Sequence, residues 1–343
     1  MPNRVLTEAI DALASGRDLP SEQTAAVLAE IMHGEASEVE TAAFLIALRT
    51  KGETVEEIVG LATTMRRLAI AVDAGRDVLL DTAGTGGGRP TFNVSTTAAF
   101  IAAGAGCRVA KHGNRSATSQ CGSADVLEAL GGRIEVGVDV VEACIREIGF
   151  GFMFAPRHHP AFKHIVPVRK ELGVRTIFNF LGPLTNPAGA TRQLLGVSAR
   201  HYQETIAEAL VGLGCERALV VSGDDGVDEI TIGGRTRVIE VANGRTEEWF
   251  LTPEDLGIQR VDLPAISGGT PAGNAAVVRR VLEGEGGPAR DVIALNAGAA
   301  IMVAGGAHDL PAGVERARAT IDSGAALGVL ERLRLLSREL AAT

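Results

Sequence analysis

The sequence has few aromatic residues and fewer basic than acidic residues, and both shortages exclude a class of function. Aromatic residues make up only 3% of 343 positions, which argues against surfaces on which nucleobases stack. The formal net charge is −9, and no basic stripe is evident, although nucleic acids and anionic membranes attract one. We therefore expect a protein that binds neither nucleic acid nor membranes.

Cysteines and long hydrophobic runs are also scarce. The four cysteines, Cys107, Cys121, Cys144 and Cys215, are widely spaced, so neither a disulfide framework nor a zinc site is expected. No run of 18 apolar residues occurs, and the N-terminus lacks a charged stretch leading into an apolar block. These absences predict a soluble, cytoplasmic protein.

Small aliphatic residues and glycine are what the sequence has in abundance. Apolar residues make up 46% of the chain, and there are 42 glycines, which indicates an aliphatic core and many tight turns. A chain of this length exceeds the usual size of one domain. We expect two domains.

Residues 1–70 have the periodicity of helices. Ser37 is followed three residues later by Glu40, and Thr54 by Glu57, so each pair predicts a capping box at a helix start. Glycines stand where helix C-caps are expected, at Gly16, Gly34 and Gly52. The pattern predicts a four-helix bundle.

Beyond residue 75, short aliphatic runs alternate with glycine-containing loops and helical patterns. This alternation is typical of a mainly parallel sheet covered by helices, so we predict an α/β fold with a small helical domain, residues 1–73, and a larger domain, residues 74–343. Asn243-Gly244 predicts a hairpin turn. Residues 165–190 break this alternation with Pro183 and Pro187. We expect this segment to cross between the two domains.

The stretch LLDTAGTGGG indicates a loop suited to phosphate. We expect a strand to end at about Asp81-Thr82 and the glycines from Gly84 to Gly88 to point several backbone N–H groups at one anion. A glycine cluster alone is more often an ordinary tight turn. Neither standard nucleotide-binding glycine motif is present.

The next two elements raise the case for an anion site. Asn93, Ser95 and Thr96 stand at the expected start of a helix, where unpaired N–H groups favour anions, although Ser95 could simply be an N-cap. Lys111 and Arg115 then follow at the carboxyl end of the next strand, the edge where α/β sheets bind ligands.

A cluster of acidic residues is the fourth polar segment expected to contribute to a ligand site. Asp224, Asp225, Asp228 and Glu229 lie within six residues, a density that favours a cation or a basic partner. Magnesium bridging to a phosphate fits, because that ion needs only one or two carboxylates. The alternative is a solvated acidic turn.

Together these motifs resemble the anthranilate phosphoribosyltransferase family. The likeness rests on GTGG, NVST, KHGNRSATS, GSADVLEALG, HPAFKHIVPVRKELGVRTIFNFLGPLTNP and DGVDE, and it extends over nearly the whole chain. It implies a fold like that of nucleoside phosphorylases and phosphoribosyltransferases. It also implies a reaction of tryptophan biosynthesis, in which anthranilate and 5-phosphoribosyl-1-pyrophosphate (PRPP) give phosphoribosyl-anthranilate and pyrophosphate.

The resemblance also implies roles for individual residues. Those expected to bind PRPP are Gly84, Gly87, Gly88, Thr91, Asn93, Ser95, Thr96, Lys111, Arg115, Thr118, Ser119 and Ser123. Those expected to bind anthranilate are Gly84, His112, Asn114, Arg169 and Pro183, with the Arg169 guanidinium facing the carboxylate. Ser95, Asp228 and Glu229 are expected to meet Mg²⁺, with two ions bound. No residue is assigned as a general acid or base.

One position departs from the family pattern. The family usually has GTGGD, whereas Gly88 replaces the aspartate here, and Arg89-Pro90 close a loop that is one residue shorter. We hypothesise that the missing carboxylate alters the response to magnesium or pyrophosphate and that Arg89 compensates by contacting phosphate. A Gly88→Asp variant tests this.

Two alternatives share the expected fold. A pyrimidine nucleoside phosphorylase would use the same glycine loop for inorganic phosphate, and a non-catalytic paralogue could bind nucleic acid, although the net charge disfavours it. The family resemblance further implies a homodimer formed through the helical domain.

Overall fold

The computed structural model describes residues 2–75, 77–116 and 119–340. Thr118, one of the expected PRPP contacts, lies outside these residues. In the described part of the chain, no helix is long and apolar enough to cross a membrane.

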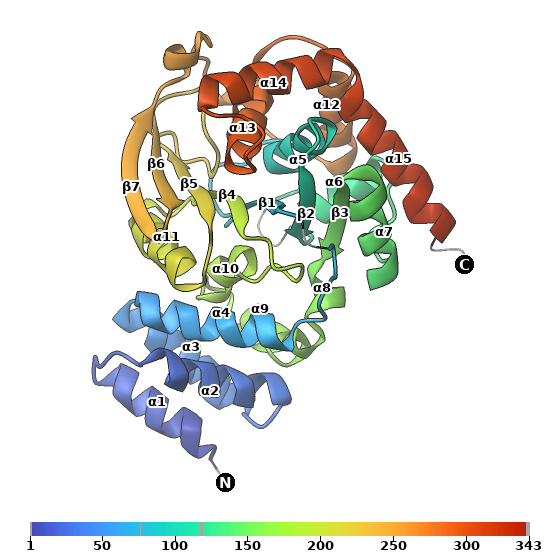
Figure 1. Cartoon of the computed structure of the whole chain (residues 1–343). Coiled ribbons are helices and arrows are strands. Elements are labelled where there is room, and N and C mark those ends of the chain that lie inside the picture. Colours follow the sequence, from blue (N-terminus) through green and yellow to red (C-terminus); the bar gives the residue numbers. More distant parts are fainter. Residues whose placement is uncertain (1, 76, 117–118, 341–343) are drawn as a thin grey trace.

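The first helices form the predicted bundle at one end of the molecule (Figure 1). They are α1 (Arg4–Ala14), α2 (Ser21–His33), α3 (Glu38–Lys51) and α4 (Val55–Leu68). Both predicted capping boxes are present, at Ser37 and Thr54. Gly34 and Gly52 are C-caps as expected, but α1 is capped one residue before Gly16, because the Ser15 N–H already bonds the last carbonyls of that helix.

A seven-stranded, mainly parallel sheet forms the centre of the larger part of the molecule. Its strands are β1 (Leu79–Gly84), β2 (Arg108–Gly113), β3 (Phe150–Phe154), β4 (Arg192–Gly196), β5 (Arg217–Gly223), β6 (Thr236–Ala242) and β7 (Arg245–Leu251), in the order β3-β2-β1-β4-β5-β6-β7. Strands β1 to β5 run parallel, and β6 and β7 are antiparallel. The predicted hairpin turn joins β6 to β7, with Asn243 at a φ of 54°.

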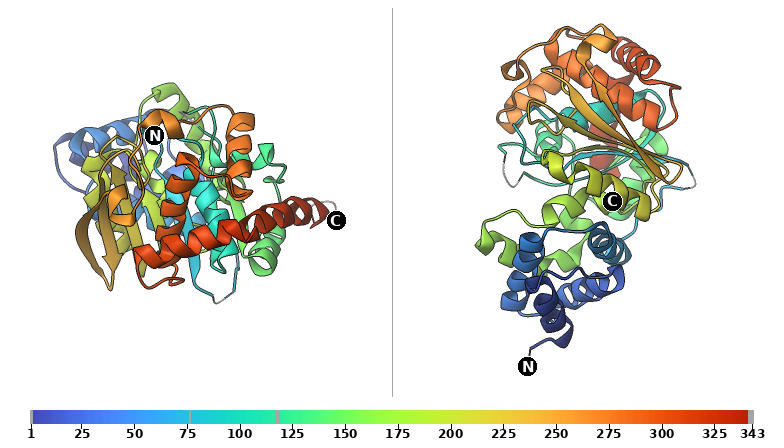
Figure 2. Two further views of the ribbon diagram at one scale, coloured as in Figure 1. Left: turned by 90° about the horizontal axis from the view of Figure 1, so that it is seen from above. Right: turned by 90° about the vertical axis from the view of Figure 1, so that its left-hand side faces the viewer.

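Helices cover both faces of the sheet (Figures 1 and 2). They are α5 (Val94–Gly104), α6 (Ser123–Ala129), α7 (Val138–Ile148), α8 (Ala155–His158), α9 (Val166–Leu172), α10 (Phe178–Leu181), α11 (Gln203–Gly212), α12 (Pro271–Leu282), α13 (Pro288–Val303), α14 (Leu310–Asp322) and α15 (Ala325–Glu339). Short 3₁₀ helices are η1 (Pro160–His164), η2 (Gly182–Leu184), η3 (Arg200–Tyr202), η4 (Pro253–Leu256) and η5 (Leu263–Ile266).

Two hydrophobic cores lie on opposite faces of the sheet. One contains the buried residues of α5, α7 and α12 to α15, together with sheet residues such as Leu80 and Val221. The other joins the bundle helices to α9, α10 and α11 and to sheet residues such as Val220 and Ile239. The helical bundle is therefore packed continuously with the α/β part, through the second core.

Residues 165–190, here called the crossover segment, supply much of that junction. Ile165 and Val168 near α9, and Phe178 and Leu181 in α10, are buried in the same core as the bundle. The segment then returns to the sheet at β4. The division into residues 1–73 and 74–343 remains a prediction.

The strand order reverses between β1 and β4. From β1 the chain proceeds to β2 and β3 on one side, and it later returns to β4 and β5 on the other. At such a switch point the loops beyond the carboxyl ends of the strands diverge and leave a crevice where α/β proteins bind ligands. The glycine loop (residues 85–89), the basic loop (114–122) and the acidic loop (224–229) all follow strands at this edge.

Candidate active site at the carboxyl end of the sheet

The glycine loop is held by contacts from three distant segments. The Gly86 N–H donates to Oδ2 of Asp228 at 2.8 Å, and the Gly86 carbonyl accepts from the Ser198 hydroxyl at 2.7 Å and from Arg175 at 3.2 Å. Gly86 and Gly87 adopt φ values of 66° and 76°, which favour glycine. One amide expected to face an anion is thus engaged with a carboxylate.

Strand β1 continues to Gly84, two residues past its predicted end, because it is paired with β4 up to that residue.

Gly88 packs directly against the acidic loop. A Cβ atom at this position would lie 2.7 Å from the Gly226 carbonyl oxygen and 3.4 Å from Oδ1 of Asp228. The neighbouring Arg89 N–H donates to the same Gly226 carbonyl at 3.1 Å. A side chain does not fit at residue 88 while these two loops are in contact.

The start of α5 lies beside the glycine loop in sequence and carries an unused hydroxyl. Oγ1 of Thr96 is buried and has no hydrogen-bond partner among the described residues. The N-cap position belongs to Asn93, not Ser95, and the Asn93 side chain accepts from Asn274 at 2.9 Å. Thr91 forms a bridge with Ser267. The exposed N–H groups of a helix start and a free hydroxyl are suited to phosphate.

Lys111 lies within β2 and is only 1% exposed. Its ammonium group donates to the Thr82 carbonyl and lies 3.4 Å from the Ser95 hydroxyl, while the Thr82 hydroxyl donates to the Ser95 carbonyl at 2.9 Å. Burial lowers the pKa of Lys111 to about 8, against the opposing influence of Asp81 and Glu229. Lys111 thus reaches the carboxyl-end edge of the sheet through its contacts with Thr82 and Ser95.

The first two carboxylates of the acidic loop are engaged by side chains outside the glycine loop. Asp224 forms ion pairs with Arg200 and Arg235, and Asp225 accepts from the Thr231 hydroxyl at 2.6 Å. Each of these two aspartates is thus engaged by a neighbouring side chain.

Asp228 and Glu229 face the site. Burial raises the pKa of both carboxyl groups, and Asp228 raises that of Glu229 further. The cationic groups that offset this effect are Arg175 for Asp228 and Lys111 for Glu229. Two adjacent, partly buried carboxylates that disfavour each other's charge suit a divalent cation.

The donor set fits magnesium better than it fits a structural metal. In the described ranges, no group of three or more His, Cys, Asp or Glu side chains is arranged to hold an ion. Mg²⁺ needs only one or two carboxylates when water and substrate phosphates complete its coordination. Asp228 and Glu229, with the Ser95 hydroxyl, fit that requirement.

Two neutral histidines lie between the sheet and the crossover segment. The rings of His112 and His159 are 5.1 Å apart, and Nδ1 of His112 lies 3.2 Å from the carbonyl of Gly182, the residue before Pro183. Burial lowers the pKa of His112 to about 3 and that of His159 to about 4. Nε2 of each ring is buried without a hydrogen-bond partner in the described structure.

Arg169, on α9, is a partly buried cation. Its guanidinium lies 5.7 Å from the centre of the Phe178 ring, and burial lowers its pKa. Among the described residues no carboxylate forms an ion pair with it. A planar carboxylate on a ligand matches this group.

The basic loop is folded onto its own helix. Arg115 forms ion pairs with Asp125 and Glu128 of α6 and is substantially exposed. The hydroxyl of Ser123 donates to the Asn114 carbonyl at 3.2 Å, and Ser119 contacts Ser116. These contacts engage the Arg115 charge with carboxylates and link the described parts of the loop to each other and to α6.

Sequence reasoning missed two residues of this site. Arg175 contacts the Gly86 carbonyl and packs over Phe180, and Ser198 follows β4. Arg175 stands in the quoted motif RTIFNFLGPLTNP, so that motif was the available signal. Ser198 carries no recognisable motif, because only the parallel pairing of β1 and β4 places it beside Gly86.

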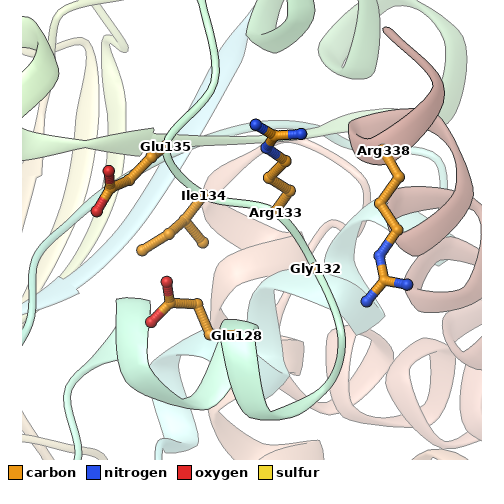
Figure 3. A pocket seen from close by; sticks show the side chains of 6 residues that line it. All are labelled: Glu128, Gly132, Arg133, Ile134, Glu135 and Arg338. Carbon is orange, nitrogen blue, oxygen red and sulfur yellow. The ribbon is translucent and has the colours of Figure 1, made fainter. Parts of the chain in front are cut away.

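A hollow of about 540 Å³ lies elsewhere on the surface (Figure 3). Its lining residues are Glu128, Gly132, Arg133, Ile134, Glu135 and Arg338. The two glutamates lie on one side and the two arginines on the other. None of the residues expected to bind substrate lines this hollow.

Comparison with known families matches both parts of the chain. Residues 76–327 match the family described as "Glycosyl transferase family, a/b domain", and residues 7–69 match "Glycosyl transferase family, helical bundle domain". The fold and the site therefore define a glycosyl transferase that joins a helical bundle to an α/β domain.

Relatives make the assignment more specific. The anthranilate phosphoribosyltransferase of Rubrobacter xylanophilus is 55% identical, over 98% of this chain and 99% of its own. The crystal structure of that enzyme from Thermus thermophilus matches with a TM-score of 0.91 and 47% identity, over 96% of this chain and 99% of its own. The Saccharomyces cerevisiae enzyme, solved in complex with PRPP and Mg, matches with a TM-score of 0.88 and 29% identity, over 97% and 98%. The chain belongs to the anthranilate phosphoribosyltransferase family.

Proposed function

We propose that the protein transfers the phosphoribosyl group of PRPP to the amino group of anthranilate and releases pyrophosphate, in tryptophan biosynthesis. The observation that carries this proposal is the meeting of the glycine loop, the start of α5 and the Asp228-Glu229 pair at the β1/β4 switch point. Loops suited to phosphate and carboxylates suited to magnesium lie within contact of each other. The two alternatives, a nucleoside phosphorylase and a nucleic-acid-binding paralogue, are not favoured by the relatives.

We propose that the donor lies along the glycine loop and the start of α5. The residues that would hold it are Gly84, Gly87, Gly88, Thr91, Asn93, Ser95, Thr96 and Lys111, with Arg115, Ser119 and Ser123 from the basic loop. Thr96 supplies a free hydroxyl, and Lys111 orients Ser95. Ser95, Asp228 and Glu229 would hold Mg²⁺, with two ions proposed.

The acceptor would lie against the crossover segment. The Arg169 guanidinium, which lies over the Phe178 ring, would pair with the anthranilate carboxylate. His112, Asn114, Gly84 and Pro183 would surround the anthranilate ring. Both His112 and His159 are neutral at pH 7, so their buried Nε2 atoms offer hydrogen bonds without positive charge. A neutral surface suits the uncharged arylamine.

The chemistry breaks the bond between the ribose C1 and pyrophosphate and forms one between C1 and the arylamine nitrogen. Pyrophosphate leaves with the electron pair, and the nitrogen then loses a proton. Mg²⁺, when bound with the donor, neutralises the negative charge of the leaving group. The chain's own residues position the two substrates and exclude water, so no strong general base is needed.

The decisive experiment follows the fluorescence of anthranilate on mixing with PRPP and Mg²⁺. We expect a loss of fluorescence that requires both additions, and an Arg169→Ala variant should raise the KM for anthranilate about 10- to 100-fold. Arg157→Ala, an exposed arginine nearby in sequence, is the matched control. Wild-type protein that leaves anthranilate unchanged would contradict the proposal, and phosphorolysis of thymidine or uridine would be tested next.

We further propose a cytoplasmic homodimer formed through the helical part. Val39 on α3 is 78% exposed, and Val166 on α9 is 52% exposed, although both are apolar. Helices α3 and α9, which carry these two valines, pack against each other. Sedimentation of Val39→Glu beside the wild type tests the dimer, since a charge at its interface should dissociate it.

A further inference from the structure

The backbone pairing between strands β1 and β2 stops before they reach the site. They are paired only at Leu79–Arg108 and Leu80–Val109, although β1 continues to Gly84 and β2 to Gly113. On their other sides, β1 stays paired with β4 and β2 with β3 up to the last residue of each strand. The gap is therefore local to the β1–β2 seam, and its backbone groups need other partners.

Side chains replace the missing ladder. The His112 N–H donates to Oδ1 of Asp81 at 3.2 Å, and Nδ2 of Asn186 donates both to Oδ2 of Asp81 at 2.7 Å and to the Ala110 carbonyl at 2.8 Å. On the opposite side, the Lys111 ammonium group satisfies the Thr82 carbonyl. Asp81 and Asn186 are 1% and 5% exposed, so water cannot readily substitute.

The arrangement requires a carboxylate at residue 81. Two donors, the His112 N–H and the Asn186 amide, converge on its two oxygens, and the Lys111 charge faces it as well. Asparagine has one acceptor oxygen, so one of the two donors would lose its partner. Asn186 comes from the crossover segment and its Oδ1 accepts from the Ala188 N–H at 2.9 Å, which fixes the amide orientation.

We propose that Asp81 and Asn186 are positioning residues for the transfer reaction: they bridge β1 and β2 where the backbone ladder is interrupted, so that Lys111 and His112 face the two substrates from adjacent positions of one strand. This inference rests on the proposed function. Lys111 acts through Ser95 toward the donor, and His112 lies beside Gly182 on the acceptor side. Asp81 and Asn186 touch neither substrate themselves.

The test compares four purified full-length variants: Asp81→Asn, Asn186→Ala, the exchanged pair Asp81→Asn with Asn186→Asp, and Gln203→Met. Gln203 is the control, because it is also a fully buried amide that bridges two strands, at Val220 and Arg237, far from the site. We expect kcat/KM for both substrates to fall about 10- to 100-fold in the first two variants. The kcat/KM of the Gln203→Met control should stay within about twofold of the wild type, although its thermal stability falls by a similar amount.

The exchanged pair gives a second readout. It still has an amide at residue 81 and loses the Asn186 N–H that donates to the Ala110 carbonyl, so it should recover none of the kcat/KM lost in Asp81→Asn, and recovery would contradict the requirement for a carboxylate at residue 81. Values for Asp81→Asn and Asn186→Ala within about twofold of the wild type, or an equal loss in Gln203→Met, would overturn the inference. If Asp81→Asn does not fold, Asn186→Ala alone decides.

Hydrogen exchange of residues 108–113 separates this inference from the proposed function. The His112 amide should exchange at least about tenfold faster in Asp81→Asn than in the wild type, with no change in Gln203→Met. If the wild type proves inactive, the proposed function fails while exchange still tests the seam. Unchanged exchange in both Asp81→Asn and Asn186→Ala would refute the positioning role.

Discussion

The glycine loop and the basic loop follow neighbouring strands of one sheet, yet they are held in opposite ways. Gly86 of the glycine loop contacts Arg175, Ser198 and Asp228, which lie about 90 to 140 residues away along the chain. Arg115 of the basic loop pairs with carboxylates only 10 and 13 residues further on. The glycine loop is thus held by distant segments, whereas Arg115 pairs mainly with α6, the helix that follows it, and the basic loop reaches a more distant segment where Cys121 contacts Asn93.

This difference indicates where the site is vulnerable. A change in the acidic loop or the crossover segment reaches the glycine loop through direct hydrogen bonds. A change at Arg115 in the basic loop mainly removes exposed ion pairs, which contribute little to stability. Four predictions test the contrast.

The largest effect is expected from Asp228→Asn. The amide can still accept from the Gly86 N–H, but it loses the negative charge proposed to hold magnesium, so kcat/KM should fall about 1,000-fold. Steady-state kinetics over a magnesium titration measures this. Asp224→Asn, in the same loop but paired with Arg200 and Arg235, is the control and should respond to magnesium as the wild type does. Equal losses in both variants would contradict the division of the acidic loop.

Acid should destabilise the strand that carries the basic loop. His112 and His159 have folded pKa values of about 3 and 4, below the ordinary 6.5, so the unfolded chain binds more protons as the pH falls below 6.5. Their contribution to the free energy of unfolding is complete above pH 6.5 and is lost toward pH 4 and below, by on the order of 3 kcal/mol per histidine.

Urea unfolding, repeated at intervals from about pH 4 to about pH 8, measures this loss of stability. His159→Gln should show a shallower fall with acid than the wild type, while His308→Gln, at an exposed histidine, should follow the wild type. Parallel curves for all three proteins would contradict the prediction, because they would mean that His159 binds its proton equally well in the folded and unfolded chain.

In Gly88→Asp, kcat/KM should fall about 10- to 100-fold. The new side chain meets the Gly226 carbonyl and brings a carboxylate toward Asp228, which displaces the glycine loop. Gly234→Asp, a glycine with open space around it, is the matched control. Improved affinity for magnesium or pyrophosphate in Gly88→Asp would instead support a missing ligand, the hypothesis drawn from the family pattern. An Arg89→Ala variant tests the proposed compensation.

The smallest change is expected from Arg115→Gln. Its ion pairs are exposed, so the free energy of unfolding should change by less than about 1 kcal/mol, as it should for Arg260→Gln, another exposed paired arginine. The KM for PRPP should nevertheless rise about threefold or more in Arg115→Gln alone. An unchanged KM would remove Arg115 from the proposed donor site, and a large loss of stability would contradict the local character of the basic loop.

Much of the local structure could be predicted from particular residues. The capping boxes at Ser37 and Thr54 and the turn at Asn243 depend on contacts within a few residues, so their patterns were sufficient. The end of β1 was placed two residues early, because its last pairs are made with β4, more than 100 residues away. The roles of the individual site residues remain predictions.

The sequence by itself determined the order of helices and strands, the mainly parallel sheet and the segments that carry polar chemistry, since periodicity, caps and glycines act over short distances. Only the tertiary structure decided which of those polar groups are already engaged. Asp224 is paired with arginines and Asp228 contacts the glycine loop, Lys111 is buried beside Ser95, and Asp81 bridges β1 and β2 where their backbone pairing stops. The physical reason is that burial and hydrogen-bond partners depend on segments far apart in the chain, which meet only when the sheet is assembled.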